Sequence, residues 1–245
     1  MESSGGERTL FQTTQWTVVL GSARRGEEEG RRCLEKLCET YWRPLYRFAR
    51  RLGNSPSDAE DLVQSFFEVL LGREGFAGAS PEGGKFRAYL LAAFKKHAAE
   101  DHRRAQRLKR GGGVLTLSLD WESEESGLKI EADDPRSPDV LYDQDWARVL
   151  LDGVLEKVAA RFREEERGHE FEAMRGYLTV RSEQVKYREL AEELGMTEGA
   201  ARVAVHRLRK LYRHALRDEI AGTLSKEESV EEEMRALFLA LTERD

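Results

Sequence analysis

The sequence predicts an all-α fold with two helical domains joined by an acidic linker. Residues that favour helices, among them Ala, Leu, Glu and Arg, are abundant, and the 245 residues include only five prolines. Strand-like alternation is confined to the VLTLSL run at 114–119. Residues 111–139 hold three consecutive glycines, many acids and two prolines, and this composition and length indicate a linker between domains.

Five segments are expected along the chain, because composition and periodicity change at their limits. They are an N-terminal arm (1–26), a first helical domain (27–110), the linker (111–139), a second helical domain with a helix-turn-helix (140–220) and an acidic amphipathic C-terminal helix (221–245). The last segment has an apolar stripe that has to pack on its own domain or on a partner, and the stripe consists of Val230, Met234, Leu237, Phe238 and Leu241.

The first domain begins with apolar residues at helical spacing over 27–52. Pro44 lies inside this stretch and is expected to kink the helix or split it in two. GNSPS at 53–57 then breaks the chain, and Ser55 or Ser57 is placed to cap the next helix. Two helices joined by a short turn are therefore expected.

The next helix, expected at 58–71, is apolar on one side and polar on the other. Its inward-facing residues are expected to be Leu62, Phe66, Val69 and Leu70. Acids in the first turn complement the helix dipole. The polar residues considered for its outer side are Asp58, Asp61, Gln64 and Glu68. Two interpretations are open: a solvated face, or an acidic docking surface for a basic partner.

A Gly-rich loop at 72–85 leads to one long basic helix at 85–110. This helix carries nine Lys and Arg against two acids, and aromatic residues lie in its first half. Basic residues interleaved with aromatic ones suit a single or opened nucleic-acid strand, whose bases can stack. A solubilising face is the alternative. The cations on the outside of this helix include Lys95, Lys96, Arg103 and Arg104.

The net charge of −6 hides an alternation of basic and acidic stretches. Residues 120–145 contain ten acids against two bases, and residues 218–245 contain nine acids against three bases. The acidic total therefore does not argue against nucleic acid, because the basic residues are gathered in helices of their own. The acids of the linker are interpreted as keeping that segment off DNA.

The second domain contains the pattern of a helix-turn-helix at 187–217. Gly195 is suited to the left-handed conformation that ends a helix, and Thr197 is a good N-cap for the helix that follows. From Gly199 to Arg217 there are six Arg and Lys and no acid. One side of this helix is apolar, and the other carries Arg202, His206, Arg207, Arg209, Lys210, Arg213 and Arg217. Such a helix suits contact with phosphates and the major groove, whereas the alternative is an ordinary solvated helix.

No arrangement of residues typical of an active site occurs. His97 and His102 are five residues apart, which is not the spacing that places two histidines on one helix face for zinc. Cys33 and Cys38 have no second pair to complete a metal site, and reduced thiols are expected. No catalytic residue, metal or cofactor is expected. Without a signal peptide or an apolar run of about 18 residues, a cytoplasmic protein with no membrane span is expected.

Taken in order, three segments resemble the extracytoplasmic-function (ECF) group of bacterial sigma factors, in the sigma-70 family of promoter-recognition subunits of RNA polymerase. The resemblance covers roughly 30–108 and 140–220. DAEDLVQSFF at 58–67 resembles region 2.2, FRAYLLAAFKKHAAEDHRRAQR at 86–107 resembles regions 2.3–2.4, and YRELAEELGMTEGAARVAVHRLRKLYR at 187–213 resembles region 4.2.

This resemblance implies two partners, core RNA polymerase and promoter DNA, and a role in transcription initiation. It implies binding to the polymerase through Asp58, Asp61, Gln64 and Glu68. It implies reading of the −10 element by Lys95, Lys96, Arg103 and Arg104. It implies reading of the −35 element by Thr197, Arg202, His206, Arg207 and Lys210.

The chain departs from the family at four of these motif positions. The family often has Asn at Lys96, Glu at Ser65, Thr at Ala200 and Arg at Ala204. The two alanines leave fewer groups that can bond base edges, so recognition of the −35 element is expected to lean on phosphates and DNA shape.

The alternative is a stand-alone helix-turn-helix regulator that binds operator DNA as a dimer. The second basic helix at 85–110 favours the sigma factor, because a sensing domain does not need it. The roles of the arm and the tail are open between binding an anti-sigma factor or other regulator, phosphorylation and simple packing.

Overall fold

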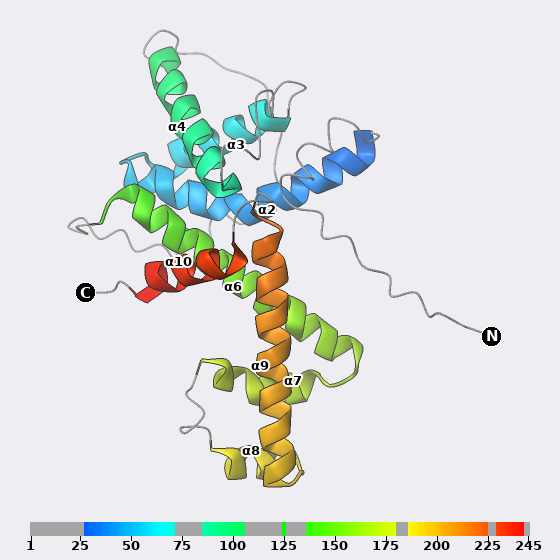
Figure 1. Ribbon diagram of the computed structural model, residues 1–245. Coiled ribbons are helices and arrows are strands. Elements are labelled where there is room, and N and C mark those ends of the chain that lie inside the picture. The colour runs from blue at the N-terminus through cyan, green and yellow to red at the C-terminus, as the bar shows by residue number, and fades with distance from the viewer. Residues whose placement is uncertain are drawn as a thin grey trace.

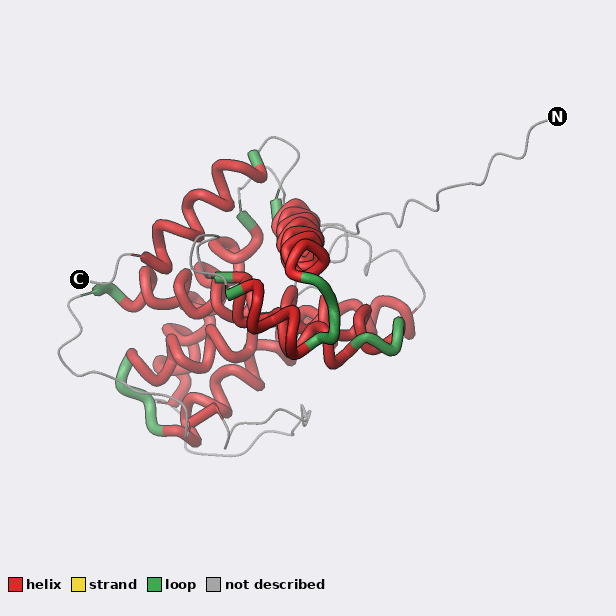
Figure 2. The backbone as a smooth tube through the Cα atoms, turned by 90° about the horizontal axis from the view of Figure 1, so that it is seen from below, coloured by secondary structure: helices red, strands yellow, loops and turns green. Residues whose placement is uncertain are grey.

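The computed structural model is all-α over the residues that it describes, and this confirms the predicted fold class. Within these residues there are eight α-helices, one 3-10 helix and no strand (Figures 1 and 2). The described residues are 27–71, 85–105, 124–125, 136–179, 186–224 and 229–242. The expected arm, the VLTLSL run, the Gly-rich loop and most of the linker lie outside them.

The helices follow the expected order along the chain. They are α2 (Glu27–Arg51), α3 (Pro56–Leu71), α4 (Phe86–Ala105), α6 (Pro138–Glu164), α7 (Gly168–Arg175), the 3-10 helix η2 (Gly176–Leu178), α8 (Tyr187–Glu193), α9 (Glu198–Ala221) and α10 (Val230–Thr242). In Figure 1, α2, α3 and α4 form one end of the molecule, and α7, α8 and the start of α9 form the other.

Helix α2 runs through Pro44 as one helix, so the expected split does not occur. Aromatic side chains are buried on both sides of the proline, with Tyr41 and Tyr46 at 0% exposure and Phe48 at 1%. Each such side chain contributes about 1.5–3 kcal/mol on burial, and together they exceed the roughly 3 kcal/mol that a proline costs inside a helix.

Helix α3 begins two residues earlier than expected, at Pro56, a residue suited to the first helical position. Ser55 is the cap, because its hydroxyl accepts a hydrogen bond from the Asp58 backbone N–H at 3.2 Å. Leu62, Phe66 and Leu70 are buried as expected. Val69 was expected to face inward, and this is wrong: it is 58% exposed, because it lies on the outer face with Asp61.

The larger apolar core joins α2, α3 and α4 to the first half of α6. Aromatic rings meet edge to face in its centre, such as Phe48 with Tyr142 at 6.2 Å between ring centroids and Phe66 with Phe94 at 5.1 Å. Trp146 of α6 is 0% exposed and is among the largest fully buried side chains. The smaller core joins the second half of α6 to α7, α8 and the first half of α9.

The limits expected for the two domains stay a prediction. The boundary between the two apolar cores lies inside α6 and not at residue 139. Val154 belongs to the core shared with α2, whereas Val158 belongs to the core around α8 and α9. Helix α6 is continuous over its 27 residues. It therefore connects the two cores as a single rod.

Several acids of the stretch at 120–145 bind arginines of α2. Asp145 is buried and contacts Arg47 at 3.0 Å and Arg51 at 2.5 Å. Glu125 contacts Arg50 at 2.7 Å and accepts a hydrogen bond from the Tyr46 hydroxyl at 2.6 Å. These carboxylates therefore hold the first core together, a role that the sequence interpretation did not assign to them.

The Arg50 hydrogen bond, followed by the Tyr46 hydroxyl, holds the pKa of Glu125 below its ordinary value of 4.5. A lowered pKa in the folded state means that the stabilisation is present above pH 4.5 and is lost as the pH falls through the folded-state value. We expect Glu125→Gln to lower the free energy of unfolding by about 1–2 kcal/mol at pH 7. The loss should shrink at acid pH, as measured by urea unfolding across that range.

Glu164→Gln at the exposed end of α6 is the matched control and should change little at either pH. A deficit of Glu125→Gln that stays the same size as the pH falls well below 4.5 would contradict the proposed ionic contribution.

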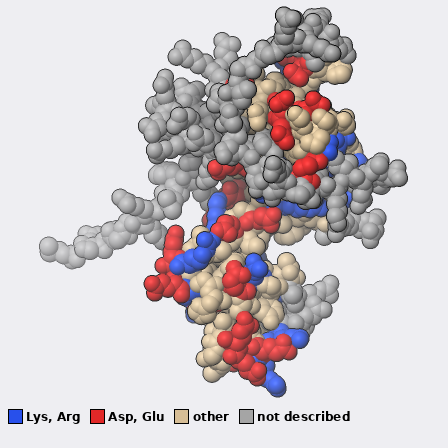
Figure 3. Space-filling model, turned by 180° about the vertical axis from the view of Figure 1, so that it is seen from behind, with Lys and Arg blue, Asp and Glu red and all other residues tan. Residues whose placement is uncertain are grey.

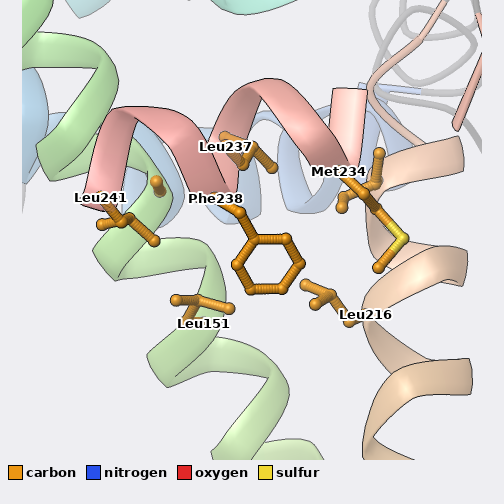
Figure 4. Close-up of a pocket in the computed structure, with 8 residues that line it drawn as sticks. Leu151, Leu216, Met234, Leu237, Phe238 and Leu241 are labelled. Atoms are coloured by element: carbon orange, nitrogen blue, oxygen red, sulfur yellow. The ribbon is translucent and has the colours of Figure 1, made fainter. Parts of the chain in front are cut away.

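The C-terminal helix α10 lies across α6 and α9, as its apolar stripe requires. Leu237 is buried, while Met234 and Leu241 are half-buried against Leu151 of α6 and Leu216 of α9 (Figure 4). Phe238 lies at the edge and is 49% exposed. Gln144 of α6 is buried and donates a hydrogen bond to the carbonyl oxygen of Ala240 at 2.7 Å, which adds a polar contact to this packing.

Candidate nucleic-acid interface

Helices α8 and α9 are joined by the tight turn that the sequence predicts. Gly195 has a φ of +62°, a left-handed conformation that side chains disfavour. The Thr197 hydroxyl accepts a hydrogen bond from the Ala200 backbone N–H at 3.2 Å, so Thr197 is the N-cap of α9. Leu190 and Ala201 are fully buried between the two helices. The turn therefore fixes how α9 projects from the second core.

The outer face of α9 presents most of the predicted cations. Arg202, His206, Arg207 and Lys210 are all exposed. Arg209 was placed on this face by its spacing, and this is wrong. Its guanidinium reaches back to the Tyr177 carbonyl oxygen, with N–O distances of 2.8 and 3.1 Å, because η2 ends beside it. Arg209 therefore joins α9 to η2.

Arg202 is held by two neighbours although it remains accessible. Its guanidinium carbon lies 4.6 Å from the centre of the Tyr187 ring in α8. Its Nη2 atom lies 2.9 Å from a carboxylate oxygen of Glu198. These contacts set the direction of the side chain, and the Glu198 carboxylate is the anion that pairs with it.

An open groove of about 610 Å³ runs along one flank of α9. Its α9 side is formed by small and apolar residues, including Gly199, Ala200 and Val203. Phe162 and Met174 line the opposite side from α6 and α7. Ala200 and Ala204 thus both lie along this flank, beside Arg207.

On α4 the predicted cations differ in how far they are engaged. Lys96 and Arg103 are exposed. Lys95 contacts Asp139 of α6 at 2.5 Å, and both side chains are about half exposed. The backbone of Arg104 lies in α4, but its side chain lies outside the described residues, as do residues 106–110.

The docking residues predicted on α3 form a mixed face. Asp58 and Asp61 are exposed, whereas Gln64 and Glu68 are half-buried. Asp58 is hydrogen-bonded to the Ser55 hydroxyl at 2.6 Å, which ties it to the start of the helix. Asp61 lies about one turn further along the helix and is exposed as well.

The structure places these predicted surfaces apart from one another. In Figure 1, α3 and α4 lie at one end, and the start of α9 lies at the other. On the face seen in Figure 3, basic side chains lie beside acidic ones in the lower part of the molecule and form no single broad patch. A ligand that touches both basic helices must therefore span the length of the molecule.

The sequence interpretation missed the charged residues that the fold buries. Arg87 at the start of α4 is 7% exposed, and its guanidinium carbon lies 4.7 Å from the centre of the Trp146 ring. Glu233 of α10 is 2% exposed and pairs with it. The position of Glu233 in the sequence was a signal for its burial, because it precedes Met234 and lies one turn before Leu237 on an otherwise apolar stripe.

Among the described residues, no group of three or more His, Cys, Asp or Glu could hold a metal ion. Within that same part of the chain, no helix is long and apolar enough to cross a membrane.

Within the described residues, α4 and α9 each present exposed cations, and α3 presents exposed carboxylates. Residues 37–108 match the family model of Sigma-70 region 2. The matched segment contains most of α2 and all of α3 and α4, and it supports a sigma-70 family sigma factor. A region of this family implies binding to core RNA polymerase and promoter DNA. Searches of curated proteins and of solved structures found no match.

Proposed function

We propose that the chain is an ECF-type sigma factor that binds core RNA polymerase and directs it to promoters with −10 and −35 elements. The observation that carries this proposal is the Sigma-70 region 2 match at 37–108 together with a second, distant basic helix in α9. A sigma factor needs two DNA contacts because promoter elements are separated along the duplex. A stand-alone regulator needs only the second.

In this proposal α3 docks on the polymerase through Asp58, Asp61, Gln64 and Glu68. Helix α4 binds the −10 strand through Lys95, Lys96, Arg103 and Arg104. Exposed cations neutralise phosphates, and bases that leave the duplex gain stacking energy on aromatic or planar groups. No bond is made or broken by the chain itself, so promoter opening draws on binding free energy.

Helix α9 binds the −35 element through Arg202, His206, Arg207 and Lys210, with Thr197 capping the helix. The N-terminus of α9 carries the positive end of the helix dipole, which favours a phosphate beside Thr197. Because Ala200 offers no hydrogen-bonding side chain, phosphate contacts and DNA shape contribute a large share of recognition.

Run-off transcription with core RNA polymerase and a library of genomic promoter fragments tests this function. We expect transcripts to appear only when the chain is added and their start points to share two sequence elements upstream. Operator binding without any polymerase-dependent transcript would overturn the sigma-factor assignment and favour a stand-alone regulator.

Arg202→Ala should weaken binding to DNA that carries the −35 element by roughly 5- to 100-fold, because a contact to phosphate or base is lost. If the contact is to phosphate, the slope of the logarithm of the association constant against the logarithm of the salt concentration should also become shallower by about one. Electrophoretic or anisotropy titration of the full chain at several salt concentrations measures both quantities.

Arg163→Ala is the matched control, since Arg163 is exposed on α6 and its loss changes the net charge equally. An unchanged affinity and footprint for Arg202→Ala would remove Arg202 from the −35 interface.

A further inference from the structure

We propose that α10 is an autoinhibitory element. Its Glu233 pairs with Lys85 and Arg87 at the start of α4, and α10 must undock when a nucleic-acid strand binds there. The proposal goes beyond the sigma-factor assignment, and it rests on that assignment only for the idea that α4 binds a strand.

Three helices meet around Arg87. Glu233 of α10 forms ion pairs with Arg87 and with Lys85, the latter at 2.5 Å. Arg87 also donates a hydrogen bond from Nε to Asp143 of α6 at 2.8 Å and stacks over the Trp146 ring. This contact therefore links α10 to the beginning of α4, which is the part of the chain that matches Sigma-70 region 2.

The contact is specific to one carboxylate of α10. The Glu233 side chain is 1% exposed, whereas its neighbours Glu231 and Glu232 are exposed. A buried carboxylate is strongly unfavourable without a cation beside it. Helix α10 can therefore dock in this register only while Lys85 and Arg87 are available to Glu233.

Lys85 immediately precedes α4, and its spacing continues the helix face that carries cations predicted to bind DNA. Lys85, Lys96 and Arg103 are spaced by 11 and 7 residues, which are close to three and two helical turns. Between them Ala88, Ala92 and Ala99 are exposed and small, while the half-buried Tyr89 and the exposed Glu100 lie at the margin of the face. Lys85 itself is 34% exposed. A strand that follows this face therefore reaches Lys85 and meets Glu233 there.

Carboxylate and phosphate compete for the same cation, because both are oxygen anions that accept charge-assisted hydrogen bonds. Docking of α10 and binding of a strand then oppose each other. Because coupling between two binding events is reciprocal, each lowers the affinity of the other by the same factor. The state with α10 docked is the resting state, and a bound strand favours the undocked one.

Two variants of the full chain separate this local contact from a general charge effect. Glu233→Gln and Glu232→Gln remove one negative charge each from neighbouring residues of the same helix, but only Glu233 contacts Lys85 and Arg87. We expect Glu233→Gln to bind a short single-stranded DNA oligonucleotide about three- to tenfold more tightly than the wild type. Glu232→Gln should remain close to the wild type. Equal affinities for the two variants, or weaker binding by Glu233→Gln, would overturn the proposal.

The wild-type chain supplies a second measurement that does not depend on a variant folding. Arg235 is an exposed residue of α10, and trypsin can cut after it once the helix undocks and unfolds. We expect the oligonucleotide to accelerate cleavage at Arg235, and unchanged or slower cleavage would refute the linkage. Neither measurement uses polymerase. If the chain shows this linkage but supports no run-off transcription, the sigma-factor assignment is wrong and the autoinhibitory role of α10 still stands.

Discussion

We expect the double substitution Asp61→Arg and Gln64→Ala to strongly weaken the proposed binding of the chain to core RNA polymerase. Asp61 is exposed on α3, so an arginine there is accommodated without disturbing the core. Reversing a charge at a complementary interface removes one attraction and adds one repulsion, and such changes cost about 2–5 kcal/mol or more. The expected loss of affinity is therefore about 30-fold or greater, measurable by fluorescence anisotropy or quantitative pull-down with purified core enzyme.

The same variant should keep its helical circular dichroism and its affinity for DNA that carries the −35 element, because α9 lies at the other end of the molecule. Glu156→Arg, a charge reversal at an exposed position of α6, is the control for net charge. Full retention of core enzyme by the double variant would show that α3 is not the docking helix.

Trp146→Ala should produce the largest loss of stability of any substitution considered. The indole is fully buried in the core that α6 shares with α2, and Arg87 stacks on its face. Removing a buried tryptophan leaves a cavity and costs about 3–5 kcal/mol. Since domains of this kind are stable by about 5–15 kcal/mol, a large fraction of the total is lost.

Urea unfolding followed by circular dichroism measures this loss. Val140→Ala, at an exposed position in the first turn of the same helix, should change the free energy of unfolding by less than about 1 kcal/mol. A loss below that limit for Trp146→Ala would mean that the first half of α6 does not pack on α2.

The sequence by itself determined the elements whose causes are local. Gly195 and Thr197 end one helix and start the next through conformations and hydrogen bonds that involve only their neighbours. Periodicity placed most inward-facing residues of α3 and α9 correctly, because one face of a helix repeats every 3.6 residues. In α10 it placed Leu237 correctly, whereas Phe238 is 49% exposed. Val69 and Arg209 escaped this rule, since a residue near the boundary of a face can turn to either side.

Only the tertiary structure decided the fate of the charged residues. Asp145 has the same composition signal as the exposed acids around it, and the position of Glu233 in the apolar stripe hints at burial without naming a partner. Both are buried against cations far away in the sequence. A carboxylate is buried only where a partner offsets its loss of hydration, and that partner is supplied by another helix. The sequence therefore gives the positions of the acids. The tertiary structure determines whether each acid stays exposed, binds the arginines of α2 or pairs α10 with the start of α4.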